Sequence, residues 1–164
     1  MRVVFDSNVL LAALLFPGGR AAAAAVKNIL DGVDDLVLSP PLIREVLSVL
    51  AKKFSRDREE LSRVAVVLGE MGEIVNPSRR LSVFRDDPDN RILECAVEGH
   101  AEAILTGDKA MLAVGEYEGI RLISLAEYLD RRASRAIWPS QDPGRLSGGN
   151  GSSRRRSAPL PARR

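Results

Sequence analysis

The sequence of 164 residues contains one cysteine, Cys95, and one histidine, His100. A single cysteine excludes a disulfide bond within the chain, and the two residues together are too few for a Cys/His zinc site. A chain of this length buries about two-thirds of its unfolded surface, so it can fold without either kind of cross-link. Such sparing use of cysteine suits a reducing compartment, and we expect a cytoplasmic location.

Long hydrophobic runs and aromatic residues are also scarce. The longest apolar run, residues 9–16, has eight residues. A membrane-spanning helix needs about 20, so we expect no membrane association. Asp6 and Asn8 interrupt the apolar region that a signal peptide needs at this place. The seven aromatic residues lie mostly in or beside expected helices and strands, which argues against a module that binds single strands by base stacking.

Acidic and basic residues are unevenly distributed along the chain. Residues 131–164 hold nine arginines and one acid, Asp142, so this segment carries +8 and residues 1–130 carry −6. The segment is rich in glycine, proline and serine and poor in large apolar residues, which predicts a disordered tail over residues 133–164. We interpret the tail as a solubilising extension, and the alternative is an arginine arm that contacts nucleic-acid phosphates.

The first 132 residues alternate between short apolar runs and helical patterns. Strands are predicted at residues 1–5, 36–38, 73–75, 103–106 and 121–124. Helices are predicted at residues 8–16, 21–30, 40–54, 57–69, 87–98, 109–114 and 125–132, with Ser39 and Asp87 as capping residues. This alternation is typical of a mostly parallel sheet covered by helices, so we expect one three-layer α/β domain over residues 1–132.

Two acids follow predicted strands directly or nearly so. Asp6 closes the first strand, and Asp108 follows the fourth strand after one glycine. In parallel sheets, ligands bind beyond the carboxyl ends of the strands, so both acids are candidate site residues. Each acid also stands just before a predicted helix, and a helix cap is the alternative role for each.

Two further acids share helix faces with expected core residues. Glu45 lies three residues after Leu42 on its predicted helix. Asp89 lies three residues before Ile92 on another, so both carboxylates lie at the level of the core. A lone carboxylate is costly to bury unless it is paired or bound to a metal. The alternative is that both side chains remain hydrated at the rim.

Asp6, Glu45, Asp89 and Asp108 are therefore expected to converge at one edge of the sheet. A cluster made only of carboxylates suits hard cations such as Mg²⁺ or Mn²⁺. Without the cation, the like charges repel one another and raise at least one pKa. With it, the cluster can align phosphate oxygens, activate a water and stabilise a leaving oxygen. The sequence thus predicts a nuclease-type site that needs neither histidine nor cysteine.

Four segments carry a family resemblance. They are residues 6–10 (DSNVL), 42–47 (LIREVL), 89–93 (DNRIL) and 105–109 (LTGDK). In this order they resemble the successive motifs of a PIN domain over residues 1–130, most closely those of prokaryotic PIN-family toxins of toxin–antitoxin systems. The ordered set is more specific than any single motif. The implied fold is a PIN-like α/β/α domain with a central, mostly parallel sheet, followed by the tail.

The resemblance implies a Mg²⁺- or Mn²⁺-dependent endoribonuclease that acts on RNA and has a cognate antitoxin protein as its partner. It also implies a homodimer, as does the apolar surface of residues 9–16 and 57–69, which exceeds what one small domain hides. The family motifs assign the catalytic and metal-binding role to four acids and a supporting role to two polar residues, namely Asp6, Glu45, Asp89 and Asp108, and Asn8 and Thr106.

The chain departs from the PIN pattern in two places. Some relatives carry a further acid just after the last motif, where this chain has Lys109, which leaves open whether one or two metal ions bind. The doublet Asp86-Asp87 leaves the third acid open, although the apolar register of the helix favours Asp89.

The implied mechanism is hydrolysis of an RNA phosphodiester by a metal-activated water. In-line attack leaves a 5′-phosphate and a 3′-hydroxyl. The alternative is a non-catalytic PIN-fold module that binds RNA or protein. Unused carboxylates beside a core only lower stability, which argues against that alternative.

Overall fold

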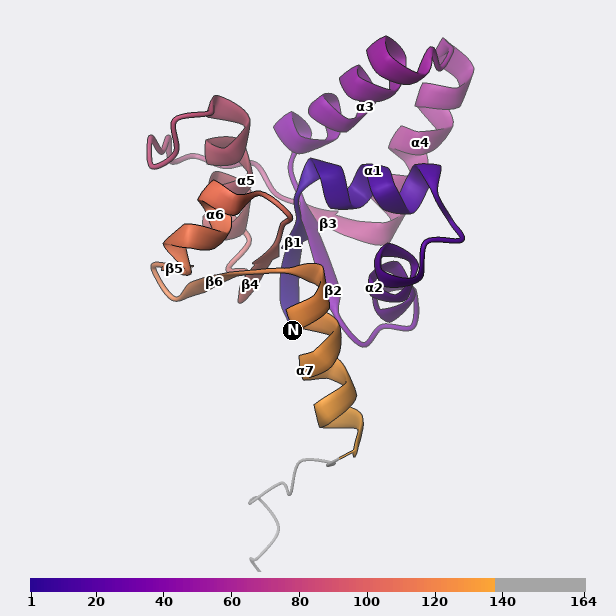
Figure 1. The fold of residues 1–164 in the computed structure, drawn as a ribbon. Helices are drawn as coiled ribbons and strands as arrows, with labels where there is room; N and C mark the ends of the chain where they lie inside the picture. Colours follow the sequence, from indigo (N-terminus) through magenta and orange to yellow (C-terminus); the bar gives the residue numbers. More distant parts are fainter. Residues whose placement is uncertain (138–164) are drawn as a thin grey trace, which may run out of the picture.

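A six-stranded sheet forms the centre of the computed structural model, which describes residues 1–137 (Figure 1). Its strands are β1 (Arg2–Phe5), β2 (Asp35–Leu38), β3 (Gly72–Ile74), β4 (Ala103–Leu105), β5 (Glu116–Tyr117) and β6 (Ile120–Ile123). They lie in the order β3-β2-β1-β4-β6-β5, and every pairing is parallel except that of β5 with β6. The predicted fold class, an α/β domain with a mostly parallel sheet, is confirmed.

Helices connect and cover these strands. In the described part of the chain they are α1 (Ser7–Leu15), α2 (Arg20–Leu30), α3 (Pro40–Phe54), α4 (Arg58–Met71), α5 (Asp87–Glu98), α6 (Lys109–Val114) and α7 (Leu125–Ile137). Over residues 1–137, no single helix is long and apolar enough to cross a membrane. The helices α1 and α2 reach that length and composition only as a pair, across a bend of 98°.

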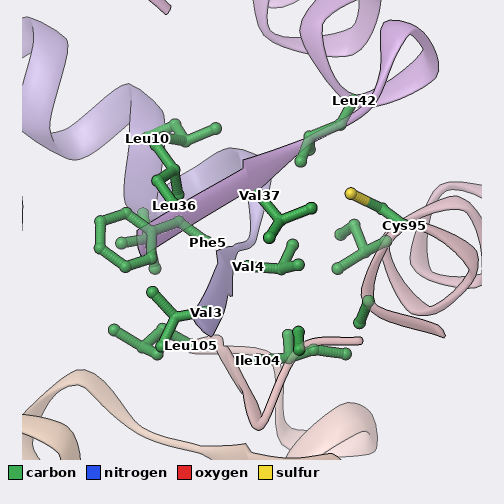
Figure 2. Packing of buried hydrophobic residues seen from close by; sticks show 14 of the residues in the cluster. Val3, Val4, Phe5, Leu10, Leu36, Val37, Leu42, Cys95, Ile104 and Leu105 are labelled. Carbon is green, nitrogen blue, oxygen red and sulfur yellow. The ribbon is translucent and has the colours of Figure 1, made fainter. Parts of the chain in front are cut away.

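Side chains of the central strands alternate between the two faces of the sheet. Phe5 of β1 lies on the side of α1, near Leu10, whereas Val4 lies on the other side with Val37 of β2 and Cys95 of α5 (Figure 2). Each of these side chains is at most 1% exposed. Both faces of β1 are therefore buried, as is usual for parallel strands covered by helices. Cys95 is a packing residue in this core.

The starts of α3 and α4 differ in their capping. Asp57 begins α4 with a capping box, because its carboxylate accepts from the Glu60 N–H at 2.9 Å and the Glu60 carboxylate accepts from the Asp57 N–H at 3.0 Å. Ser39 precedes α3 as predicted, but its hydroxyl makes no capping hydrogen bond. Pro41 has no N–H at the second helical position, so only one of the two usual donors to a cap, the Leu42 N–H, is present.

Apart from shifts of one or two residues at the ends of elements, the structure differs from the predictions in three places. The two-residue strand β5 was not predicted. Helix α5 includes Asp87, so Asp86 rather than Asp87 occupies the capping position. Helix α7 continues to Ile137, so residues 133–137 are helical rather than part of the predicted tail. The first proline after residue 132 is Pro139, so no residue stops the helix earlier. The rest of the predicted tail, residues 138–164, lies outside the described residues.

Candidate functional site

The carboxyl ends of β1 and β4 bring two aspartates to the same edge of the sheet. The two strands are parallel neighbours. Asp6 directly follows β1, and its N–H donates to the Leu105 carbonyl at the end of β4 at 2.9 Å. Asp108 lies three residues beyond Leu105. Asp6 is 2% exposed and Asp108 is half-buried. This is the edge at which parallel sheets bind ligands.

Thr106 links these two aspartates. Its side chain is fully buried, and its hydroxyl donates to Asp6 Oδ2 at 2.5 Å. The same hydroxyl accepts from the Asp108 N–H at 3.0 Å. Thr106 thus holds the Asp6 carboxylate and the backbone N–H of Asp108 at the same time. Asn8, the other predicted supporting residue, contributes its backbone N–H, which donates to Asp6 Oδ1 at 2.5 Å, while its side chain is exposed.

Asp6 and Asp108 also cap helices, which is the alternative role that the sequence analysis gives for each of them. Asp6 caps α1 through the bond from the Asn8 N–H. Asp108 caps α6 by accepting from the Met111 N–H at 2.9 Å. Each carboxylate has about four lone-pair positions, so a cap occupies only part of its capacity. Capping and ligand binding are therefore compatible at these positions.

Glu45 reaches the same edge from α3. Its side chain is half-buried, and its Oε1 atom accepts a hydrogen bond from the Ser7 hydroxyl at 3.3 Å. Burial raises the pKa of Glu45, the bond from Ser7 opposes this shift, and the charge of Asp6 adds to it. Ser7 was not singled out in the sequence. Its only signal was its place next to Asp6 in the first turn of a helix.

Asp89 completes the cluster from the first turn of α5. Its pKa is raised from 3.8 to about 6, first by burial and then by the charges of Asp108, Asp6, Asp86 and Glu45. The charges of the other three predicted acids therefore act on Asp89. The two aspartates of the doublet Asp86-Asp87 differ in their interactions. The charge of Asp86 acts on Asp89, whereas the exposed Asp87 carboxylate accepts a hydrogen bond from Arg91 at 3.0 Å.

The cluster has no cation of its own in the described residues. None of Asp6, Glu45, Asp89 and Asp108 forms an ion pair with a Lys, Arg or His of residues 1–137. Most other buried carboxylates of proteins are paired, because an unpaired buried charge is costly. The negative charge at this edge is thus uncompensated.

The donor set fits a hard divalent cation. It consists of carboxylate oxygens with neighbouring hydroxyls, the ligands that Mg²⁺ and Mn²⁺ prefer. Over residues 1–137, no group of three or more acidic, histidine or cysteine side chains is arranged so that it could hold a metal ion. Asp6, Glu45 and Asp108 instead face hydrogen-bond donors of their own neighbourhood.

A three-layer α/β/α domain with a carboxylate cluster at the carboxyl ends of its parallel strands defines the class of this protein. A family model described as a PIN domain matches residues 2–110. The chain belongs to the PIN domain family.

Similar proteins include one relative in sequence and two solved structures. Uncharacterized protein MJ1680 of Methanocaldococcus jannaschii is 28% identical over 122 residues, which cover 70% of this chain and 75% of the relative. In fold, the chain is similar to VapBC2 of Rickettsia felis, solved with a DNA fragment from its promoter, with a TM-score of 0.55 and 14% identity over 76% of this chain and 98% of that one. VapBC-1 of nontypeable Haemophilus influenzae gives a TM-score of 0.49 and 16% identity over 77% of this chain and 99% of that one.

Proposed function

We propose that this protein is a Mg²⁺- or Mn²⁺-dependent endoribonuclease and the toxin component of a toxin–antitoxin system. The observation that carries the proposal is the uncompensated charge of four carboxylates at the ligand-binding edge of the sheet. Their mutual repulsion contributes to the pKa of about 6 at Asp89. A cluster that lowers the stability of the free protein in this way is best explained by a ligand that neutralises it.

Asp6, Glu45, Asp89 and Asp108 are the residues that would hold the cation. When bound, the cation would polarise the phosphodiester and lower the pKa of a water. Thr106 and the Asn8 N–H hold the Asp6 carboxylate in one orientation, with bonds of 2.5 Å each. The Ser7 hydroxyl does the same for Glu45. Because these donors are fixed by β4 and α1, the ligands are oriented before any substrate arrives.

The proposed reaction is in-line hydrolysis of an RNA phosphodiester. The water oxygen forms a bond to phosphorus, the bond from phosphorus to the 3′-oxygen breaks, and that oxygen leaves with a proton. The products are a 5′-phosphate and a 3′-hydroxyl. The number of metal ions is not part of the proposal, since Lys109 occupies the place of a further acid.

Cleavage of a mixed RNA panel tests the proposal. We expect cleavage with Mn²⁺ or Mg²⁺, none in EDTA, and none with Asp6→Asn or Asp89→Asn. Asp57→Asn is the matched control, because Asp57 lies at the start of α4 and asparagine also caps helices. Full activity in both site variants would contradict the site. No cleavage by folded wild type free of partners would favour the non-catalytic PIN module.

We also propose that the protein acts on RNA in the cytoplasm. There it binds a cognate antitoxin protein and forms a homodimer. The solved protein VapBC2 is similar in fold to this chain. Apolar side chains remain exposed directly after α1 and on α4, among them Phe16 at 62% and Val66 at 58%. An exposed apolar surface of this kind marks protein interfaces. Sedimentation of the purified chain should give the mass of a dimer, and the mass of one chain would contradict this part.

A further inference from the structure

The loop that leads into α5 is held by a buried asparagine of that helix. Asn90 is 3% exposed. Its Oδ1 atom accepts from the N–H groups of Val83 and Phe84 at 2.9 and 2.8 Å. Its Nδ2 atom donates to the carbonyls of Phe84 and Asp86 at 2.8 and 3.4 Å. Every hydrogen-bonding position of the amide is therefore used on the backbone of one short loop.

A second buried side chain holds the beginning of the same loop. Glu94 lies one turn after Asn90 and is 2% exposed. It accepts from the Leu81 N–H at 2.7 Å and pairs with Arg91 at 3.1 Å. The Leu81 carbonyl in turn accepts from Arg91 at 3.3 Å. Neither Asn90 nor Glu94 is needed to form a helix, so their burial serves to hold the loop in one shape.

The loop borders the carboxylate cluster. Its last residue, Asp86, is one of the charges that act on Asp89. Asn90, which holds the loop, is the residue after Asp89 in the chain. The end of the loop is held by Asn90, the residue after Asp89, so α5 sets its position relative to Asp89.

Arg85 is the arginine of this region that remains available to a ligand. Arg79 binds Glu118 with two hydrogen bonds of 2.8 and 2.9 Å, and Arg80 and Arg91 pair with Glu94. Arg85 is exposed and forms no ion pair within residues 1–137. Its neighbours Phe84 and Asp86 are both bonded to Asn90, so the backbone that carries its guanidinium is fixed on either side.

We infer that Arg85 binds a backbone phosphate of the RNA strand beside the scissile position, and that Asn90 is the positioning residue that holds Arg85 there. The inference rests on the proposed ribonuclease function. Residues 1–130 carry −6, so an RNA strand that enters an acidic site needs local cations to offset repulsion. A guanidinium on a pre-ordered loop binds phosphate through paired N–H groups and loses less freedom on binding.

Binding of a fluorescent single-stranded RNA to the full chain, measured in EDTA over a series of KCl concentrations, tests the inference. Arg85→Ala should weaken binding about tenfold at low salt, the loss expected for one charge-assisted contact. It should also reduce the slope of log affinity against log salt by about 0.7, because one phosphate contact is gone. Arg85→Lys should keep the slope and lose part of the affinity.

Arg58→Ala is the matched control, because Arg58 is exposed at the start of α4 and forms no ion pair in the described part of the chain. It should leave affinity and slope unchanged. With Mn²⁺, Arg85→Ala should raise KM and leave kcat close to that of wild type. If Arg85→Ala matches Arg58→Ala in affinity, slope and KM while wild type binds and cleaves RNA, the inference is overturned and the proposed function stands. Wild type that neither binds nor cleaves RNA overturns both.

Asn90→Ala tests the positioning role. If Asn90 acts through Arg85, Asn90→Ala lowers RNA affinity and its slope as Arg85→Ala does, and the double variant is no weaker than the weaker single one. Additive losses in the double variant would overturn the positioning role. Circular dichroism establishes that Asn90→Ala is folded, and the Arg85 variants decide the phosphate contact independently of it.

Discussion

Two buried aspartates at opposite ends of the sheet share nearly the same surroundings. Asp34, just before β2, and Asp6, just after β1, are each 2% exposed. Each accepts a hydrogen bond of 2.5 Å from a buried hydroxyl of a distant segment, Tyr128 of α7 for Asp34 and Thr106 for Asp6. Burial and hydrogen bonding alone therefore do not distinguish the two ends.

The difference between them is the cation. Asp34 pairs with Arg132 of α7, so its charge is compensated within the protein. Asp6 forms no ion pair within residues 1–137, and its charge raises the pKa of both Asp89 and Glu45. Where a buried charge serves the fold, this chain supplies the partner, as it does again for Glu94 with Arg91. Among residues 1–137 the carboxylate cluster has no such partner, and an external cation is expected at its edge.

Neutralising each aspartate should give the largest contrast between the two ends. Asp34→Asn leaves the Arg132 charge without its partner, and we expect a loss of about 3 kcal/mol in the free energy of unfolding. Asp6→Asn loses hydrogen bonds but also removes a repulsive charge, so in EDTA we expect a change of at most about 1 kcal/mol. Urea denaturation of both variants measures this difference. Equal losses would mean that the two ends are both structural.

Adding Mn²⁺ should stabilise the folded protein, because the cation compensates the charges of the carboxylate cluster around Asp6. At a free Mn²⁺ concentration of 100 times Kd, we expect about 2.7 kcal/mol of stabilisation of wild type. This corresponds to a rise in Tm of about 5–10 °C. Asp6→Asn should lose most of the rise, while Asp34→Asn should keep it. Scanning calorimetry gives the measurement, and an equal rise in wild type and Asp6→Asn would place Mn²⁺ elsewhere.

The two buried hydroxyls provide a finer comparison. Thr106→Val and Tyr128→Phe each remove the hydroxyl and keep the shape of the side chain closely. Each should cost about 1–2 kcal/mol of stability, because an aspartate loses its donor. Only Thr106→Val should also weaken Mn²⁺ binding, by about tenfold, since it orients a proposed ligand. Isothermal titration with Mn²⁺ separates the two, and an unchanged affinity in Thr106→Val would remove its positioning role.

Much of the fold could be predicted because its signals are local. Buried apolar runs mark β1, β2, β4 and β6, and helical periodicity marks the helices between them. Strand β5 has only two residues, and its pairing comes from the turn into β6, so no apolar pattern announced it. Glycine is disfavoured in strands by local preference. Strand β3 nevertheless begins at Gly72, because the Gly72 backbone pairs with that of Leu36.

The site was predictable to the level of its acids and not to the level of their partners. Asp6 and Asp108 follow strands, and Glu45 and Asp89 share helix faces with core residues, so sequence spacing locates them. The hydroxyls of Thr106 and Ser7 reach Asp6 and Glu45 only through tertiary packing, across 100 and 38 residues. The support from Asn8 comes from its N–H and not from its side chain, a distinction that residue type does not reveal.

The smallest expected effect is a pH dependence of stability that arises from the carboxylate cluster and not from Asp34. The pKa of Asp89 is about 6 in the folded protein, above its ordinary value of 3.8. Between these values the folded state holds a proton that the unfolded state has released, so the stability of metal-free protein falls as pH rises from about 4 to 6. Asp89→Asn removes this dependence and should be more stable than wild type at pH 7. Asp89 is only half-buried, so solvent screening keeps the gain to the order of 1 kcal/mol.

Denaturation curves in EDTA at pH 4, 5, 6 and 7 measure that gain, with Asp57→Asn as the control for loss of one carboxylate far from the cluster. The gain of Asp89→Asn over wild type should be near zero at pH 4 and reach its full value above pH 6. Saturating Mn²⁺ should cancel it at pH 7, because the cation compensates the charges that raise the pKa of Asp89. A gain that persists in Mn²⁺ would mean that burial alone raises this pKa, and that the cluster does not act as one site.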